Sequence, residues 1–433
     1  MQALNLGSNS LKQPRKLHLT CATFASVVVL VYLASCGVES DSKTGGTNEQ
    51  EGNCGRGIVV VGTDYVSTNV SLMSFDGAVL SSSFISSAST TSELSTPLGG
   101  DVALSTARNE GDSIVILDRY PAAVLTWVDI QSGTPSGQLS VTTGFRSNPR
   151  DYLEISPSKA YVTRYDSNLE QGQQQFDEGG DVLIIDPLTR SIKGRIPLES
   201  AIDDAPEGCS PNPDKMLSVG SSVAVLLGAY LDYFSSASSR IVRLNPSLDT
   251  IEETLVLEGM HSCTAMALSP SKKEIAVSCS GDYGSDSAAR MAESGIVLVS
   301  AEDGWVEKRR FPAASFGLGP VGDGIAYVSE DTLVFTTQGS FPSETSSQEE
   351  DAFLVINTHS GDFKTLLRSD GMPFSLGGVR CAPECGVCFL ADAERSGGVV
   401  HRFEVEPDGT FGTGTEIVVD SAIGLPPRGL GVF

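Results

Sequence analysis

A unit of two short strands joined by a turn recurs seven times in this chain, and it limits the fold more than any other feature. The clearest copy is residues 181–198, where an Asp-Pro turn separates two apolar runs. Recurrence of one such unit along a whole chain is typical of repeat folds. The other six copies begin near Val70, Val124, Arg240, Gly295, Ala352 and Val399.

A second pair of strands precedes each unit, for example residues 150–164 and 263–279. Four antiparallel strands in a repeat of about 40 to 60 residues form one blade of a β-propeller. The sequence therefore predicts an all-β, seven-bladed β-propeller. Six or eight blades are the alternatives, because the first and sixth copies are poorly patterned.

The two ends of the repeat region predict how the ring closes. The chain enters the first repeat at residues 57–61 with what looks like a second strand, and residues 428–433 look like a first strand with nothing after it. We expect these N- and C-terminal strands to pair within one blade. Such closure also removes the exposed sheet edges of an open array.

The third repeat resembles the YVTN family of β-propellers. Tyr161-Val162-Thr163-Arg164 corresponds to the Tyr-Val-Thr-Asn strand end of that family, with Arg164 in the place of Asn. The turn at residues 182–186 and the strand at residues 194–196 match its Val-Ile-Asp and Gly-x-Ile elements. The resemblance implies a propeller of extracellular or surface type and no particular activity.

The N-terminus has the pattern of a secretory signal. Basic residues precede an apolar run from about Leu17 to Leu33, and Leu33-Ala34-Ser35-Cys36 resembles the lipobox of bacterial lipoproteins. We predict a signal peptide at residues 1–35, a lipidated flexible tether at 36–53 that starts at acylated (palmitate-bearing) Cys36, and the propeller at 54–433. An uncleaved membrane anchor is the alternative. Gly37 after the cysteine resembles the sorting pattern of outer-membrane lipoproteins, so we expect a lipid-anchored location in the bacterial cell envelope, at the outer membrane, on its periplasmic face or the cell surface.

The charge balance excludes one class of partner. The chain has 29 basic and 54 acidic residues, a net charge of −25. Nucleic acid requires clustered Lys and Arg, so we expect no nucleic-acid partner. The expected partners are therefore the membrane, through the lipid, and an unidentified protein or carbohydrate.

The cysteines predict disulfides, which an oxidising compartment permits. Cys263 and Cys279 face each other across one expected hairpin, and Cys381 and Cys388 do so across another. A bridge between Cys54 and Cys385 would lock the ring closure, which leaves Cys209 unpaired. The competing interpretation of Cys381, Cys385 and Cys388 is a zinc or cluster site.

Candidate binding residues stand where the second strands of the repeats end. Acidic and aromatic residues recur there, and the ring places them around one rim, on the face that carries the long loops at residues 166–180, 229–239, 281–294 and 338–351. Such groups suit a carbohydrate, a peptide or Ca²⁺, but Asp also caps turns. The candidates are Asp64, Tyr65, Asp118, Tyr120, Arg164, Tyr165, Asp166, Asp232, Asp282, Tyr283 and Asp392.

The sequence contains none of the Gly-x-Ser-x-Gly, His-Glu-x-x-His or Walker motifs, so we assign no catalytic residue and no cofactor other than a candidate Ca²⁺. The leading interpretation is a lipid-anchored propeller that acts as a binding or structural module. The alternative is a lactonase-like propeller hydrolase with a metal held by rim carboxylates. The hydrolase requires several acids that converge on one cation near the axis.

Overall fold

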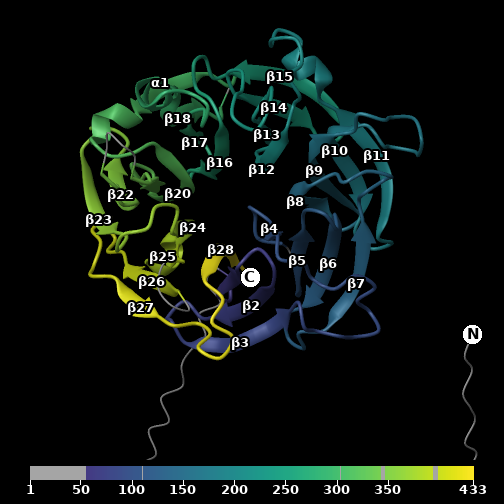
Figure 1. The fold of residues 1–433 in the computed structure, drawn as a ribbon, viewed down its shortest axis with the longest axis horizontal. Coiled ribbons are helices and arrows are strands. Elements are labelled where there is room, and N and C mark those ends of the chain that lie inside the picture. Colours follow the sequence, from purple (N-terminus) through teal and green to yellow (C-terminus); the bar gives the residue numbers. More distant parts are fainter. Residues whose placement is uncertain (1–54, 110, 303, 343–346, 394–397) are drawn as a thin grey trace, which may run out of the picture. The chain divides into compact units, whose positions relative to one another are not determined.

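The computed structural model is a closed ring of seven four-stranded antiparallel sheets (Figure 1). It describes residues 55–109, 111–302, 304–342, 347–393 and 398–433. The predicted seven-bladed β-propeller is thereby confirmed. The predicted signal peptide, Cys36 and the tether lie outside the described residues.

Each blade runs from an inner strand at the central channel to an outer strand at the periphery (Figure 1). Blade 1 consists of β28 (Pro427–Val432), β1 (Ile58–Thr63), β2 (Thr68–Met73) and β3 (Val79–Ser86), and blade 2 of β4 (Val102–Leu104), β5 (Ser113–Asp118), β6 (Val124–Asp129) and β7 (Pro135–Ser140). Blade 3 consists of β8 (Pro149–Ser156), β9 (Lys159–Ser167), β10 (Gly179–Asp186) and β11 (Ser191–Pro197). Blade 4 consists of β12 (Pro213–Val219), β13 (Ser222–Leu227), β14 (Arg240–Asn245) and β15 (Thr250–Val256). Blade 5 consists of β16 (Cys263–Leu268), β17 (Glu274–Ser280), β18 (Ser294–Ser300) and β19 (Glu307–Pro312). Blade 6 consists of β20 (Val321–Ser329), β21 (Thr332–Thr337), β22 (Ala352–Asn357) and β23 (Phe363–Arg368). Blade 7 consists of β24 (Leu376–Ala382), β25 (Val387–Asp392), β26 (Val399–Glu404) and β27 (Thr415–Ile417).

The two ends of the described chain meet in blade 1. Strand β28 pairs antiparallel with β1, with Ile58 opposite Val432 and Val60 opposite Leu430. The last strand of the chain is therefore the inner strand of the first blade, which confirms the predicted closure. The backbones of β28 and β24 also approach closely, since a Cβ at Gly377 would lie 2.6 Å from the Arg428 carbonyl oxygen. Glycine is required there because it has no Cβ.

The turn that separates the two strands of each sequence repeat lies between the third and fourth strands of a blade, and in several blades a side chain caps it. The carboxylate of Asp186 accepts hydrogen bonds from the backbone N–H groups of Leu188 and Thr189, at 3.0 and 3.1 Å. Asn245 and Asn357 cap the equivalent turns of blades 4 and 6 in the same way. Asp and Asn favour such turns because their short side chains reach the backbone two and three residues ahead.

The hydrophobic core is divided into layers between neighbouring blades. Seven clusters of buried apolar residues lie at the seven blade-to-blade interfaces of the described chain. Val60 and Leu430 of blade 1, for example, pack with Phe389 of blade 7. Both faces of each sheet are buried, which explains why the middle strands are continuous apolar runs rather than alternating ones.

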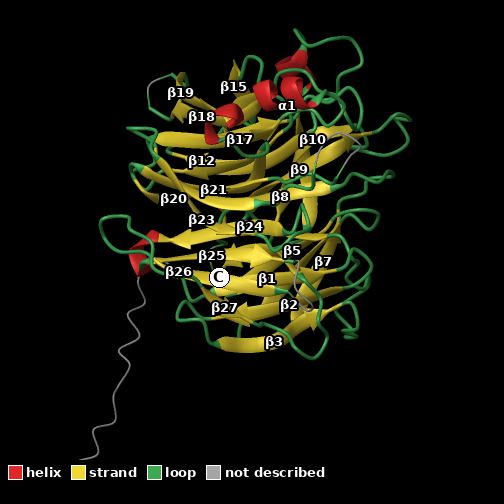
Figure 2. Cartoon of the chain, turned by 60° about the vertical axis from the view of Figure 1, so that its left-hand side comes forward, coloured by secondary structure: helices red, strands yellow, loops and turns green. Residues whose placement is uncertain are grey.

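Helices are few and short (Figure 2). They are α1 (Ser287–Glu293) in the β17–β18 loop and the 3-10 turns η1 (Glu199–Ile202), η2 (Ala313–Phe316) and η3 (Pro383–Cys385). Asp286 caps α1 by accepting hydrogen bonds from the N–H groups of Ala288 and Ala289. Within the described ranges, no helix has the length and apolar character needed to cross a bilayer.

Candidate functional site

The central channel contains a cavity of about 450 Å³. Its wall is formed by the inner strands, and its mouth by residues of the loops between second and third strands, including Tyr65, Tyr230 and Tyr283. Phe374, from the connection between blades 6 and 7, also lines it. The mouth therefore opens on the loop-bearing face, as the ring topology requires.

Charged side chains of both signs line this cavity. The cationic ones are Arg119, Arg150, Lys215, Arg380 and Arg428. The acidic ones are Asp101, Asp214, Asp323 and Asp351.

Most of the cavity acids already have partners. Asp101 is ion-paired with Arg119, and the Lys215 Nζ lies 3.5 Å from the Asp214 carboxylate. The Asp351 carboxylate accepts hydrogen bonds from backbone N–H groups, including those of Gly339 and Ser375 at 2.6 and 2.7 Å. Asp323 differs, because its side chain is exposed to the channel while its surroundings desolvate it, which raises the pKa of its carboxyl.

Four of the rim tyrosines stack against arginine side chains. The guanidinium carbon lies 3.9 to 5.2 Å from the ring centroid in all four pairs, a geometry in which the cation is attracted to the π face. The distances are 5.0 Å for Tyr65 and Arg428, 5.2 Å for Tyr120 and Arg146, 4.3 Å for Tyr165 and Arg150, and 3.9 Å for Tyr283 and Arg290.

Two of these tyrosines, Tyr165 and Tyr283, also contact a residue of the neighbouring blade. The rings of Tyr165 and Tyr230 lie 6.1 Å apart, from the loops of blades 3 and 4. Burial raises the pKa of Tyr230 to about 12. The Tyr283 hydroxyl donates to the Gln338 side chain at 2.9 Å, which connects blades 5 and 6. The rim residues of blades 3 and 4, and those of blades 5 and 6, are therefore in contact rather than being separate strand ends.

Several predicted rim acids hold the backbone of their own loops. Asp64 accepts hydrogen bonds from the N–H groups of Val66 and Ser67, and Asp232 from those of Phe234 and Ser235. These bonds lower the pKa of both carboxyls, chiefly through Ser67 for Asp64 and Phe234 for Asp232. They are the turn caps that Asp commonly forms.

Asp118 is buried, with 1% of its surface exposed, and Asp166 is half-buried. Asp118 accepts a 2.6 Å hydrogen bond from the N–H of Gly99. Burial raises the pKa of Asp118 and also that of Asp166, which lies in the field of Arg150. Neither carboxyl projects freely into solvent at the rim.

Arg164 and Asp392 lie inside the protein rather than at the rim surface, which corrects their predicted placement. The Arg164 side chain is fully buried and forms two hydrogen bonds to Asp181, at 2.8 and 2.6 Å. Asp392 lies 3.0 Å from the His401 Nε2 and is also buried. Buried charges require such partners, so both residues serve the fold of their blades.

Asp282 is the centre of a cluster that ties blade 4 to blade 5. Its carboxylate accepts hydrogen bonds from Ser236 and Ser262 at 2.7 to 2.9 Å and lies 3.2 Å from the His261 Nδ1. Ligand atoms of His261, Asp282 and Glu293 lie within 4.8 Å of one another, the one group in the described ranges with the spacing of a metal site. These oxygens are already bonded within the protein, and none of the three residues lines the central cavity.

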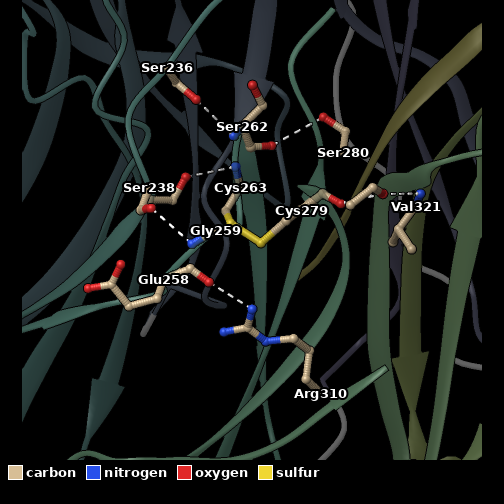
Figure 3. Close-up of a disulfide and its surroundings, with 12 residues drawn as sticks. Ser236, Ser238, Glu258, Gly259, Ser262, Cys263, Cys279, Ser280, Arg310 and Val321 are labelled. Carbon is tan, nitrogen blue, oxygen red and sulfur yellow. Dashed lines mark hydrogen bonds between the residues drawn. A yellow bond between two sulfur atoms is a disulfide. The ribbon is translucent and has the colours of Figure 1, made fainter. Parts of the chain in front are cut away.

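Both predicted hairpin disulfides are formed. Cys263 and Cys279 join β16 to β17 (Figure 3), and Cys381 and Cys388 join β24 to β25. Cys385 is also disulfide-bonded, so none of these three C-terminal cysteines is a thiolate, and the zinc alternative is wrong. Cys54, the partner predicted for Cys385, lies outside the described residues. Cys209 is free, and burial raises the pKa of its thiol.

Sequence reasoning missed the cationic residues of the channel and of the rim stacks. A signal for three of the channel residues was present, since three inner strands open with proline and a charged residue. These pairs are Pro149-Arg150, Pro213-Asp214 and Pro427-Arg428. Proline is tolerated at the first residue of a strand, and the next side chain then faces the channel. Arg119 and Arg380 have no such marker.

Comparisons with known proteins support the fold alone. No family model and no curated protein matches the chain. Among solved structures, a periplasmic gluconolactonase from Pseudomonas aeruginosa is similar at 13% identity and TM-score 0.53, over 87% of this chain and 98% of that one. A putative 6-phosphogluconolactonase from Bacteroides fragilis is similar at 10% identity and TM-score 0.53, over 88% and 98%. The β-propeller domain of Cps50 (Swd1) from Myceliophteria thermophila is similar at 11% identity and TM-score 0.51, over 81% and 98%. The fold and site together define a seven-bladed β-propeller with an aromatic rim and a charged channel.

Proposed function

We propose that this protein is a lipid-anchored propeller of the bacterial cell envelope that binds a protein partner through its loop-bearing face. The observation that carries the proposal is the distribution of exposed apolar side chains. Tyr233 is 94% exposed and Phe234 62% exposed on the β13–β14 loop, and Val66 is 80% exposed on the β1–β2 loop. Most of the other large exposed apolar residues lie on loops of the same face, including Leu169, Leu231, Tyr283, Phe341, Met372 and Phe374. Exposed apolar groups gathered on one face mark interaction sites.

The mixture of side chains favours protein over carbohydrate. Carbohydrate recognition uses flat aromatic faces, whereas Val66, Leu231 and Met372 are aliphatic or flexible. Protein interfaces bury aliphatic residues and methionine together with tyrosine and arginine, which are the residues enriched at interface hot spots.

The test compares the two faces of the ring. In one variant Tyr233→Ser and Phe234→Ser remove apolar area from the loop face. In the control, Leu188→Ser and Leu248→Ser remove it from turns on the opposite face, where these residues are 70% and 69% exposed. After cross-linking in the membrane fraction, we expect wild type and control to retain the same linked protein and the loop-face variant to lose it. Equal linkage in all three, or binding to glycans in place of a protein, contradicts the proposal.

The lipid anchor forms part of the same proposal. It is supported by the resemblance of residues 33–36 to a lipobox, and the compartment by the disulfides, which persist in oxidising surroundings. Labelled palmitate should be incorporated by the wild-type chain and not by Cys36→Ala. Incorporation by the variant removes the anchor from the proposal.

The second candidate is a lactonase-like hydrolase, favoured by the similarity of the fold to those of a gluconolactonase and a putative 6-phosphogluconolactonase. Such an enzyme with a metal or Ca²⁺ requires acids that converge on one cation. In the described part of the cavity, Asp101 and Asp214 instead form ion pairs with Arg119 and Lys215. Ca²⁺-dependent hydrolysis of a sugar lactone that is lost in Asp323→Asn would establish the hydrolase over the binding module.

A further inference from the structure

Five consecutive blades each bring one cationic side chain to the central cavity. In ring order from blade 7 to blade 4 they are Arg380, Arg428, Arg119, Arg150 and Lys215. Blades 5 and 6 contribute Thr264 and Asp323 instead. Cations therefore line the cavity in five of the seven blades, with Asp101 and Asp214 beside two of them, in a chain whose net charge is −25.

Three of these cations form no direct ion pair within the described residues, although the charge of Asp214 acts on Arg150 and that of Asp151 on Arg380. Arg119 is paired with Asp101 and Lys215 with Asp214. Over the described ranges, no carboxylate lies within ion-pair distance of Arg150, Arg380 or Arg428. A guanidinium carries five N–H donors, and partly buried ones normally meet acceptors.

The hydrogen bonds of these arginines leave most of their donors unused. Arg380 donates to the carbonyl oxygen of its neighbour Val379 at 3.0 Å. The Nε atoms of Arg150 and Arg428 are buried and have no acceptor. Burial lowers the pKa of the Arg380 guanidinium, and the attraction of Asp151 offsets only part of that effect.

Arg150 and Arg428 are also held in place. Tyr165 and Tyr65 cover their flat faces, at 4.3 and 5.0 Å. The N–H groups of a guanidinium that stacks on a ring still point outward in the plane of the guanidinium. A carboxylate or phosphate in that plane can accept two hydrogen bonds from it at once. Arg428 and Arg380 lie on β28 and β24, whose backbones are in close contact.

We propose that the cavity binds a small organic oxyanion, a carboxylate or a phosphate ester, whose charged group is held by Arg380, Arg428 and Arg150. Asp323, on the inner strand of blade 6, accepts hydrogen bonds from hydroxyl or amine groups of the same molecule. The volume of about 450 Å³ lies within the range of small-molecule sites. The mouth of this site shares Tyr283 and Phe374 with the loop face proposed above, but the anion-binding arginines lie on inner strands, so neither proposal requires the other.

The test is calorimetric titration of the full-length protein in detergent with sodium citrate and, separately, with inorganic phosphate, at ionic strength held constant with chloride. Wild type should bind at least one probe. Arg380→Gln and Arg428→Gln should each weaken that binding about tenfold or more, because each removes a charge-assisted hydrogen bond. Preference for citrate identifies a carboxylate ligand, and preference for phosphate a phosphate ester.

The matched control is Arg190→Gln. Arg190 also stacks on an aromatic ring, that of Trp127 at 5.8 Å, but lies in the β10–β11 turn and does not line the cavity. Its substitution should leave the affinity unchanged. Arg428→Lys keeps the charge and should lose less than Arg428→Gln, provided that circular dichroism shows both folded. The proposal is overturned if neither probe binds, or if affinity is the same in wild type and both cavity variants.

Discussion

The ion pair between Arg164 and Asp181 shows what a single side chain contributes inside a blade. Both side chains are fully buried between β9 and β10. Arg164→Ala leaves the Asp181 carboxylate buried without its main partner, so we expect a loss of about 3–5 kcal/mol in the free energy of unfolding. Urea denaturation measures this loss.

The control for this prediction is an exposed pair. Lys273 and Glu302 lie 3.0 Å apart with side chains 64% and 58% exposed. Lys273→Ala should change the free energy of unfolding by less than about 1 kcal/mol. A similar small change for Arg164→Ala would show that the buried pair does not support the blade.

His261 predicts a pH dependence of stability. The hydrogen bond to Asp282, and the negative charges of Asp282 and Glu293, raise the pKa of His261 above its ordinary value of 6.5. Protonated His261 therefore stabilises the folded state. This contribution is complete below about pH 6.5 and is lost as the pH rises through the raised pKa. We expect the melting temperature to fall over that interval in wild type and to fall less in His261→Gln. Parallel pH profiles for the two proteins would contradict this role.

At the residue scale, sequence reasoning located the rim tyrosines but not their partners. Tyr65 follows a second strand directly, and this placement could be predicted from the repeat. Its stacking partner Arg428 lies at the other end of the chain and reaches it through ring closure. Sequence spacing carries no information on such a contact. The rim acids were ambiguous because a carboxylate that caps a turn and one that binds a ligand occupy the same kind of position.

At the scale of a strand pair, the disulfide between Cys263 and Cys279 stabilises the inner hairpin of blade 5. The two residues are opposite each other in the β16–β17 register and are separated by 16 positions. Closing a loop of that length is worth about 3 kcal/mol in the chain-entropy model. We expect the variant with both cysteines replaced by alanine to lose about that much in the free energy of unfolding, measured by urea denaturation.

The second hairpin provides the comparison. Cys381 and Cys388 are separated by 7 positions, so their bridge restricts a shorter loop of the unfolded chain. Its double alanine variant should lose less stability than that of Cys263 and Cys279. The reverse order would show that loop entropy does not govern these bridges.

The element boundaries were largely predictable because turn-forming residues recur at the same place in the repeat. The third strands of blades 2, 4, 6 and 7 begin at Val124, Arg240, Ala352 and Val399, the residues expected from the pattern. Asp129, Asn245 and Asn357 then end three of these strands by capping the following turn. Strand β4 shows the limit, since it has three residues and too little apolar pattern to be recognised alone.

For the whole molecule, closure through β28 predicts the effect of its loss. Leu430 is 3% exposed and packs between blades 1 and 7. We expect Leu430→Ala to cost about 2–5 kcal/mol, and deletion of residues 427–433 to abolish cooperative unfolding because β1 becomes an unpaired edge. Thermal unfolding followed by circular dichroism measures both effects.

Val418 provides the control for the closing strand. It lies just beyond β27 and is 56% exposed, so Val418→Ala should leave stability within about 0.5 kcal/mol of wild type. An unchanged transition in the chain shortened by residues 427–433 would contradict a closure that depends on β28.

The charge of the whole chain did not reveal the charge of its channel. A net charge of −25 describes the solvated surface, whereas Arg150, Arg380 and Arg428 gather at the axis because each lies on an inner strand. Their convergence depends on the ring, so it could be predicted only after the inner strands and their channel-facing positions were known. The same holds for the apolar loops, which share a face only in the assembled propeller.

The central claim is that the loop-bearing face is the binding surface, and site-specific photo-cross-linking in intact cell envelopes tests it most directly. A photoreactive residue placed at Tyr233, on the loop face, should link to one discrete protein species. The same residue at Leu248, in the β14–β15 turn on the opposite face, should yield no such product. Linkage from Leu248 and not from Tyr233, or equal linkage from both positions, would contradict the claim.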